Sequence, residues 1–236
     1  MRNFRPVNEP LQETTTGHPR RWIILGILNL SLIMIIAGVS SLNLSLPSLQ
    51  RALGATGVQL VWINAAYALV FAALLLPAGA LGDRFGRRGA LQLGLAIFLA
   101  GAILATRSSS AEQIILWRCL MGVGAAFTMP ATLSILTAVF PPEERSRAIA
   151  VWAGFAGAGG AIGLLSAGLL LEYFWWGSVF FVNIPIALVA LILVTLVVPT
   201  SRDSQRRPLD PVGGLLTAGG LTGLVYGLIQ GPEFGW

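Results

Sequence analysis

A chain of 236 residues that is 55% hydrophobic and only 11% charged lacks the composition of a soluble domain, because soluble domains carry about 25% charged residues. So few charges can still cover the two thin aqueous faces of a bilayer protein. The net charge of +5 could indicate nucleic-acid binding, but we exclude that partner because the chain has no lysine and no basic stripe interleaved with aromatic residues. The single cysteine, Cys119, and the single histidine, His18, exclude a disulfide and a metal cluster, so we expect no metal and no cofactor.

Seven apolar runs are each predicted to form a membrane-spanning helix, since a span needs about 20 mainly apolar residues. In chain order they are Ile23–Leu44, Gln59–Leu81, Ala90–Ala105, Ile114–Ala138, Ala148–Leu171, Val179–Val198 and Val212–Ile229. The third run is short, so its ends must include flanking glycines and serines. The predicted fold is an all-α polytopic membrane protein with four parts: an N-terminal arm (1–21), a six-span bundle (22–198), a linker (199–211) and a seventh span with its outer end (212–236).

The arginines are distributed unevenly between the two sides of the predicted membrane. Twelve lie in the N-terminal arm and in the loops after spans two, four and six, whereas only Arg51 and Arg107 lie on the other side. The positive-inside rule then predicts a cytoplasmic N-terminus in the plasma membrane, which makes the arm and the linker cytoplasmic. Tyr173 to Trp176, between spans five and six, form an aromatic belt at the outer interface.

The loop after span two reads Gly-Ala-Leu-Gly-Asp-Arg-Phe-Gly-Arg-Arg and holds the densest group of charges next to a span. A glycine at its start lets another helix approach closely, and a glycine before the last two arginines permits a tight reversal. The acid can pair with an arginine or lie at the N-terminus of a neighbouring helix. Such a cluster can hold two helix bundles in one state and release them in another. The candidate latch is Gly79, Asp83, Arg84, Gly86, Arg87 and Arg88; the alternative is a basic turn that only sets topology.

Arg118 is the only charged residue well inside a predicted span. An arginine in hydrocarbon costs several kcal/mol unless it is paired or hydrated, so it is a candidate functional residue. It lies about one turn from the predicted outer end of span four, and the alternative is that it snorkels to the interface.

Glycines concentrate in span five, where Gly159 and Gly163 form a G-x-x-x-G pair that favours close helix packing. The end of this span, from Gly168 to Phe174, repeats the glycine, leucine, acid and phenylalanine of Gly79 to Phe85 in register. The two segments end on opposite sides of the membrane. An inverted three-helix repeat, typical of secondary transporters, would explain the match, and chance is the alternative.

Three of these motifs resemble the major facilitator superfamily: the loop Gly79–Arg88, the string Arg-Cys-Leu-Met-Gly-Val-Gly from Arg118, and the glycine run from Gly159 to Gly168. Other stretches resemble its fourteen-span drug:proton antiporters: Asn43–Pro47, Phe140–Arg145, Asn183–Pro185, Leu209–Gly213 and Gly231–Trp236. The resemblance implies the N-terminal six-helix bundle of such a transporter, followed by a seventh span. It also implies that Arg118 takes part in proton coupling and that Gly159, Gly163 and Gly168 belong to an antiporter-like motif.

The sequence departs from those exporters at three positions. Leu164 and Ala167 replace a proline and a glycine of the span-five motif, and Gly38 replaces an aspartate usual in span one. The bundle therefore supplies no evident proton carrier of its own.

The function that the resemblance implies is efflux of small lipophilic compounds, powered by a proton gradient. The implied partners are the lipid bilayer, such a substrate and protons. Asn43, Trp62 and Asn64 are candidates to line the cavity, because they place polar or aromatic groups in spans one and two. An enzyme is not expected, because the spans hold no Ser/His/Asp set and no phosphate loop.

One bundle and one further helix amount to half of such a transporter. We expect a truncated gene product or a partial sequence, with a second polypeptide or self-association able to supply another bundle. The alternative function is a membrane fragment or assembly partner that does not transport.

Overall fold

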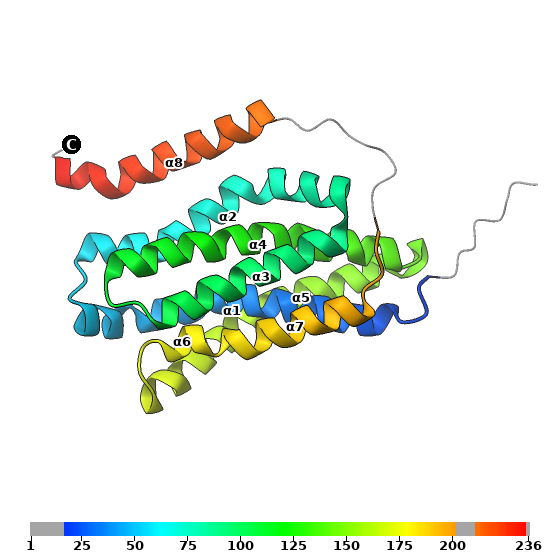
Figure 1. Cartoon of the computed structure of the whole chain (residues 1–236), viewed down its shortest axis with the longest axis horizontal. Helices are drawn as coiled ribbons and strands as arrows, with labels where there is room; N and C mark the ends of the chain where they lie inside the picture. Colours follow the sequence, from blue (N-terminus) through cyan, green and yellow to red (C-terminus); the bar gives the residue numbers. More distant parts are fainter. Residues whose placement is uncertain (1–16, 202–210, 235–236) are drawn as a thin grey trace, which may run out of the picture.

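The computed structural model describes residues 17–201 and 211–234. These ranges contain helices joined by short turns and no β-strand (Figure 1). The helices are α1 (Arg21–Leu53), α2 (Gly57–Phe85), α3 (Arg87–Thr106), α4 (Ala111–Val139), α5 (Pro142–Tyr173), α6 (Ser178–Phe181), α7 (Asn183–Val197) and α8 (Pro211–Phe234). Seven stretches of the described chain are long and apolar enough to cross a membrane, with α6 and α7 together making one. The predicted seven-span, all-α fold is confirmed.

Several helices are longer than the predicted spans. The prediction ended the first span at Leu44, but α1 continues through Pro47 and Arg51 to Leu53 and ends at Gly54, whose φ is +65°. Its 33 residues measure about 50 Å at 1.5 Å per residue, which exceeds the ~30 Å hydrocarbon core. The apolar pattern marks the part of the helix in lipid, whereas backbone hydrogen bonds extend the helix into the aqueous layer.

The predicted N-terminal arm and the predicted linker lie mostly outside the described residues. Of the arm, residues 17–21 are described, and of the linker, residues 199–201 and 211.

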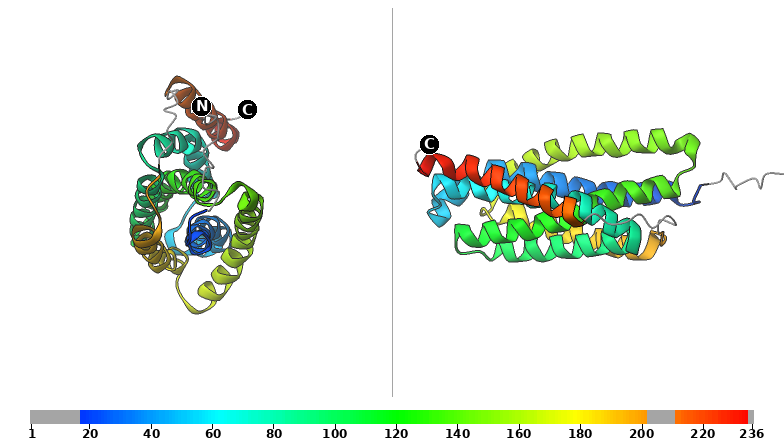
Figure 2. Two further views of the ribbon diagram at one scale, coloured as in Figure 1. Left: turned by 90° about the vertical axis from the view of Figure 1, so that its right-hand side faces the viewer. Right: turned by 90° about the horizontal axis from the view of Figure 1, so that it is seen from above.

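Helix packing follows the pattern that an inverted repeat would give. The helix α2 packs mainly on α4, and α5 packs mainly on α1, so the second helix of each three-span unit lies on the first helix of the other unit. The helix α3 also packs on both α4 and α7. In the end-on view of Figure 2, α1 lies inside the group, and α8 lies at its edge beside α2.

Two glycines of α4 allow this helix to approach two neighbours. A Cβ atom at Gly124 would lie 2.6 Å from the carbonyl oxygen of Gly94 on α3. A Cβ atom at Gly122 would lie 2.7 Å from the carbonyl oxygen of Tyr67 on α2. Both distances are too short for any side chain, so these positions need glycine for α4 to lie against α2 and α3 at this spacing.

Candidate functional site

The loop between α2 and α3 is a single residue, Gly86, with φ +130° and ψ +120°. This backbone conformation strongly favours glycine, as predicted for a tight reversal. Across the break, the Nε of Arg87 lies 2.7 Å from Oδ1 of Asp83. The carboxylate thus lies next to the first residue of α3, where the positive end of the helix dipole also favours it. Asp83 pairs with the arginine that opens the next helix.

The other residues of the candidate latch contact different helices. Arg88 donates from Nη1 to the carbonyl oxygen of Val198 at 3.1 Å, and from Nη2 to that of Thr195. It therefore caps the end of α7, where carbonyl groups lack helical partners. A Cβ atom at Gly79 would lie 3.3 Å from Cβ of Pro130 on α4. Arg84 places its Cζ 5.5 Å from the ring centre of Phe85 and makes no ion pair among the described residues.

Arg118 lies deep in the bundle. Its side chain is 0% exposed, and its Nε donates to the carbonyl oxygen of Ile63 on α2 at 3.2 Å. The predicted distance of one turn from the helix end is wrong, because α4 begins at Ala111, about two turns earlier. The snorkelling alternative is therefore wrong for this structure: the guanidinium points into the contact between α2 and α4.

The sequence did not predict the other residue of this contact, Tyr67. The Cζ of Arg118 lies 4.3 Å from the centre of the Tyr67 ring. Both Nη atoms of Arg118 and the hydroxyl of Tyr67 are buried without a hydrogen-bond partner among the described residues. The available signal was a tyrosine in the middle of an apolar span, far from either interface, where its polar group needs an explanation.

The candidate packing glycines of α5, Gly159, Gly163 and Gly168, face α1. A Cβ atom at Gly163 would lie 2.6 Å from the carbonyl oxygen of Ala37, and one at Gly159 would lie 3.2 Å from Cβ of Ile36. At Gly168 the nearest atom, Cδ2 of Leu44, would be at an ordinary 3.7 Å. The tight contact therefore centres on Gly163 and weakens toward the end of the helix.

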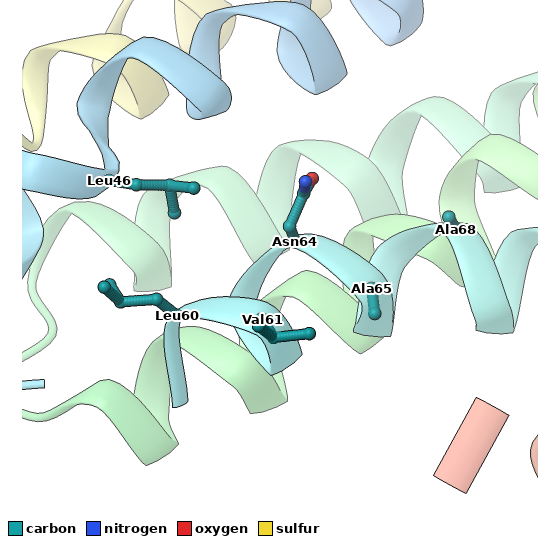
Figure 3. A pocket seen from close by; sticks show the side chains of 6 residues that line it. All are labelled: Leu46, Leu60, Val61, Asn64, Ala65 and Ala68. Carbon is teal, nitrogen blue, oxygen red and sulfur yellow. The ribbon is translucent and has the colours of Figure 1, made fainter. Parts of the chain in front are cut away.

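The two predicted cavity-lining asparagines contact each other. Asn64 donates from Nδ2 to Oδ1 of Asn43 at 2.8 Å. An open hollow of about 340 Å³ lies between α1 and α2. Figure 3 shows the side chains that line it, where Asn64 is the polar residue among Leu46, Leu60, Val61, Ala65 and Ala68. Trp62 does not line this hollow. Its ring centre lies 6.1 Å from that of Tyr226, so it packs between α2 and α8.

Acidic groups are absent from the middle of the described spans. The acids of the described helices lie near helix ends, at Asp83, Glu112, Glu143, Glu144, Glu172 and Glu233. A Cβ atom at Gly38 would lie 3.5 Å from the Phe98 ring and 3.9 Å from Oδ1 of Asn183. A longer side chain at this position would therefore point toward α3 and α7.

A second group of charges joins the starts of α1 and α5. From the sequence, these charges were interpreted only as a signal of membrane topology. Arg21 pairs with both carboxylate oxygens of Glu144, with Nε–Oε2 at 2.7 Å and Nη2–Oε1 at 2.9 Å. The Cζ of Arg147 lies 5.3 Å from the ring centre of Trp22. Sequence alone could not pair residues 123 positions apart.

Comparison with known proteins identifies the family. The sequence model of the Major Facilitator Superfamily matches residues 28–230. Methyl viologen resistance protein SmvA of Salmonella typhimurium is 41% identical over 192 residues, 81% of this chain and 39% of that protein. Multidrug efflux pump LfrA of Mycolicibacterium smegmatis is 40% identical over 210 residues, 89% of this chain and 42% of that protein. The Methylenomycin A resistance protein of Bacillus subtilis is 35% identical over 237 residues, 100% of this chain and 49% of that protein.

A solved structure shares the fold. The crystal structure of the peptide transporter POT in complex with sulfate matches with a TM-score of 0.69 at 16% identity, over 93% of this chain and 48% of that one. This chain thus spans less than half the length of each of these relatives. The seven apolar stretches of the described residues are long enough to cross a membrane. Together with the matched family model and the similar proteins, they show that the chain is a multi-pass membrane protein that belongs to the major facilitator superfamily.

Proposed function

We propose that this chain forms the first bundle of a secondary transporter that exports small lipophilic compounds across the cell membrane, powered by a proton gradient. Three relatives that are 35–41% identical are named for methyl viologen resistance, for multidrug efflux and for methylenomycin A resistance, which supports the direction and the substrate class. The N-terminus is cytoplasmic in this proposal, because the arginines gather on that side. The partners are the bilayer, the compound, protons and a second bundle.

The buried guanidinium of Arg118 is the observation that carries the proposal. A structural arginine would pair with an acid or reach water, yet this one is 0% exposed and its two Nη atoms have no hydrogen-bond partner in the described part of the chain. A charge kept inside a membrane bundle at such a cost marks an ion or proton pathway in many transporters. In the proposed mechanism, Arg118 changes the affinity of a nearby carboxylate for its proton. That carboxylate comes from the second bundle, since the described spans offer acids only near their ends.

The other candidate residues serve the conformational cycle. In alternating access, one bundle rocks against the other around a central site. Gly79 keeps α2 close to α4, and the Asp83–Arg87 pair holds α2 and α3 together at the cytoplasmic side. Arg84, without an acid partner among the described residues, reaches the other bundle.

The remaining glycines and polar residues have roles in packing and in substrate contact. Gly159 and Gly163 keep α5 tightly on α1 during the movement. The Asn43–Asn64 pair gives the substrate an uncharged polar contact beside the apolar hollow.

A chimeric transporter tests the proposal. The chain is fused to the second half of the LfrA relative, and dye efflux is measured in vesicles with an imposed proton gradient. Arg118→Met is expected to abolish gradient-driven efflux while the protein still inserts. The matched control is Arg51→Met, which removes an exposed arginine in the last turn of α1 and is expected to leave efflux unchanged.

Full efflux in the Arg118→Met chimera would refute the role of this arginine. A chimera that inserts and never exports would favour the alternative of a membrane protein without transport activity.

A further inference from the structure

The charge of Arg118 is stabilised by very few described groups. Among the described residues, the only hydrogen bond of its guanidinium is the one from Nε to the carbonyl oxygen of Ile63. Neither ion pair of the described chain includes it. A desolvated cation needs negative potential close by. A single carbonyl oxygen supplies little of it, since the carbonyl of Ile63 is also part of the backbone hydrogen bonding of α2. Among the described contacts, the face of the Tyr67 ring also lies against the guanidinium.

The geometry fits a cation–π contact. The Cζ of Arg118 lies 4.3 Å from the ring centre, well within the ~6 Å over which the ring quadrupole attracts a cation. Such contacts are strongest where water is excluded, and Tyr67 is 2% exposed while Arg118 is 0% exposed.

Neighbouring groups hold the Tyr67 ring in place. The Phe71 ring, one turn further along α2, stacks on it with ring centres 6.2 Å apart and an angle of 14° between the planes. On the opposite helix, Gly122 lets the α4 backbone approach the carbonyl of Tyr67. Because Gly122 follows Arg118 by about one turn of α4, the same close approach brings the guanidinium over the ring.

We propose that Tyr67 is the positioning residue for Arg118: its ring face acts as the counter-charge of the guanidinium and holds the guanidinium in the contact between α2 and α4. The phenol oxygen has no part in this role, since it has no partner in the described chain. The consequence for proton coupling rests on the proposed function, whereas the positioning itself does not.

The test uses the purified 236-residue chain in mixed micelles, with the unfolding equilibrium followed during titration with SDS. Tyr67→Phe keeps the ring and is expected to shift the equilibrium less than threefold. In that background, phenylalanines with one, two and three fluorines weaken the ring quadrupole at nearly constant size. Each added fluorine is expected to shift the unfolding equilibrium further toward the unfolded state. The total shift in the equilibrium constant is expected to be roughly 30-fold, the value of a desolvated cation–π contact.

Two controls separate this role from packing. In an Arg118→Met background, the fluorine series at position 67 is expected to be flat, which means that the unfolding equilibrium constant does not change with the number of fluorines. The same series at Phe71, which has no arginine over its ring among the described cation–π contacts, is expected to be flat in the unchanged protein. Since the fluorinated rings keep their size, the result does not depend on whether a truncation such as Tyr67→Leu folds.

A flat series at position 67 with Arg118 present would overturn the proposal, and so would an equal slope in the Arg118→Met background. A stepwise loss together with unchanged efflux in the Arg118→Met chimera would support the positioning role and refute the proposed function.

Discussion

A single methyl group on α5 should loosen the bundle, and the structure indicates where. A Cβ atom at Gly163 would lie 2.6 Å from the carbonyl oxygen and 2.7 Å from Cα of Ala37. These are backbone atoms, so no side chain can rotate to relieve the clash. Gly163→Ala must instead push α5 away from α1 by several tenths of an ångström.

The expected change in the free energy of unfolding of Gly163→Ala follows from two opposing effects. Overpacking a well-packed contact costs about 1–3 kcal/mol. Replacing glycine by alanine inside a helix returns about 1 kcal/mol. The expected net loss in the free energy of unfolding for Gly163→Ala is therefore about 0–2 kcal/mol. Gly157→Ala on the same helix meets no atom within 4 Å, so only the helix effect acts and stability should rise by about 0.5–1 kcal/mol.

The assay is SDS-induced unfolding of both variants and the unchanged chain in the same micelles. The comparison is internal, since both substitutions are Gly→Ala on one helix. A Gly163→Ala variant as stable as Gly157→Ala would refute the conclusion that Gly163 sets the distance between α1 and α5.

Three further predictions concern topology and transport. Reporter fusions after Gly17, Thr106 and Trp236 should report a cytoplasmic N-terminus and an outer position for the other two; a cytoplasmic signal at Thr106 would contradict the span count. In the LfrA chimera, Asp83→Asn should strongly reduce efflux and lower stability by only about 0.5 kcal/mol, the size of an i,i+4 ion pair. Unchanged efflux would mean that the loop only sets topology. The 236-residue polypeptide expressed alone should insert but not export dye from vesicles with a proton gradient, because alternating access needs two bundles; gradient-driven efflux would contradict this.

The features that could be predicted from the sequence depend on hydropathy or on the conformation that the backbone must adopt at a single residue. Seven spans follow from apolar length, and the reversal at Gly86 follows from glycine between two helical segments. Helix ends such as Leu53 were missed, because hydrogen bonding along the helix continues after the apolar pattern stops.

The contacts of the candidate site were harder to predict. Arg118 drew attention as an isolated charge, but its partner Tyr67 depends on how closely α4 approaches α2. Trp62 was assigned to the cavity by residue type alone, and its contact with Tyr226 depends on the position of α8. Residue type and local spacing contain no information on such contacts between helices.

Polar bonds tie the helix ends of this bundle together on both sides of the membrane. On the side of the arginines, Arg88 holds the end of α7 to the start of α3, and Arg21 holds α1 to α5 through Glu144. On the other side, Gln59 of α2 donates to Glu112 of α4. These bonds join the helices in pairs at their ends, so sliding α3 past α7, α1 past α5 or α2 past α4 would have to break a polar bond as well as apolar contacts.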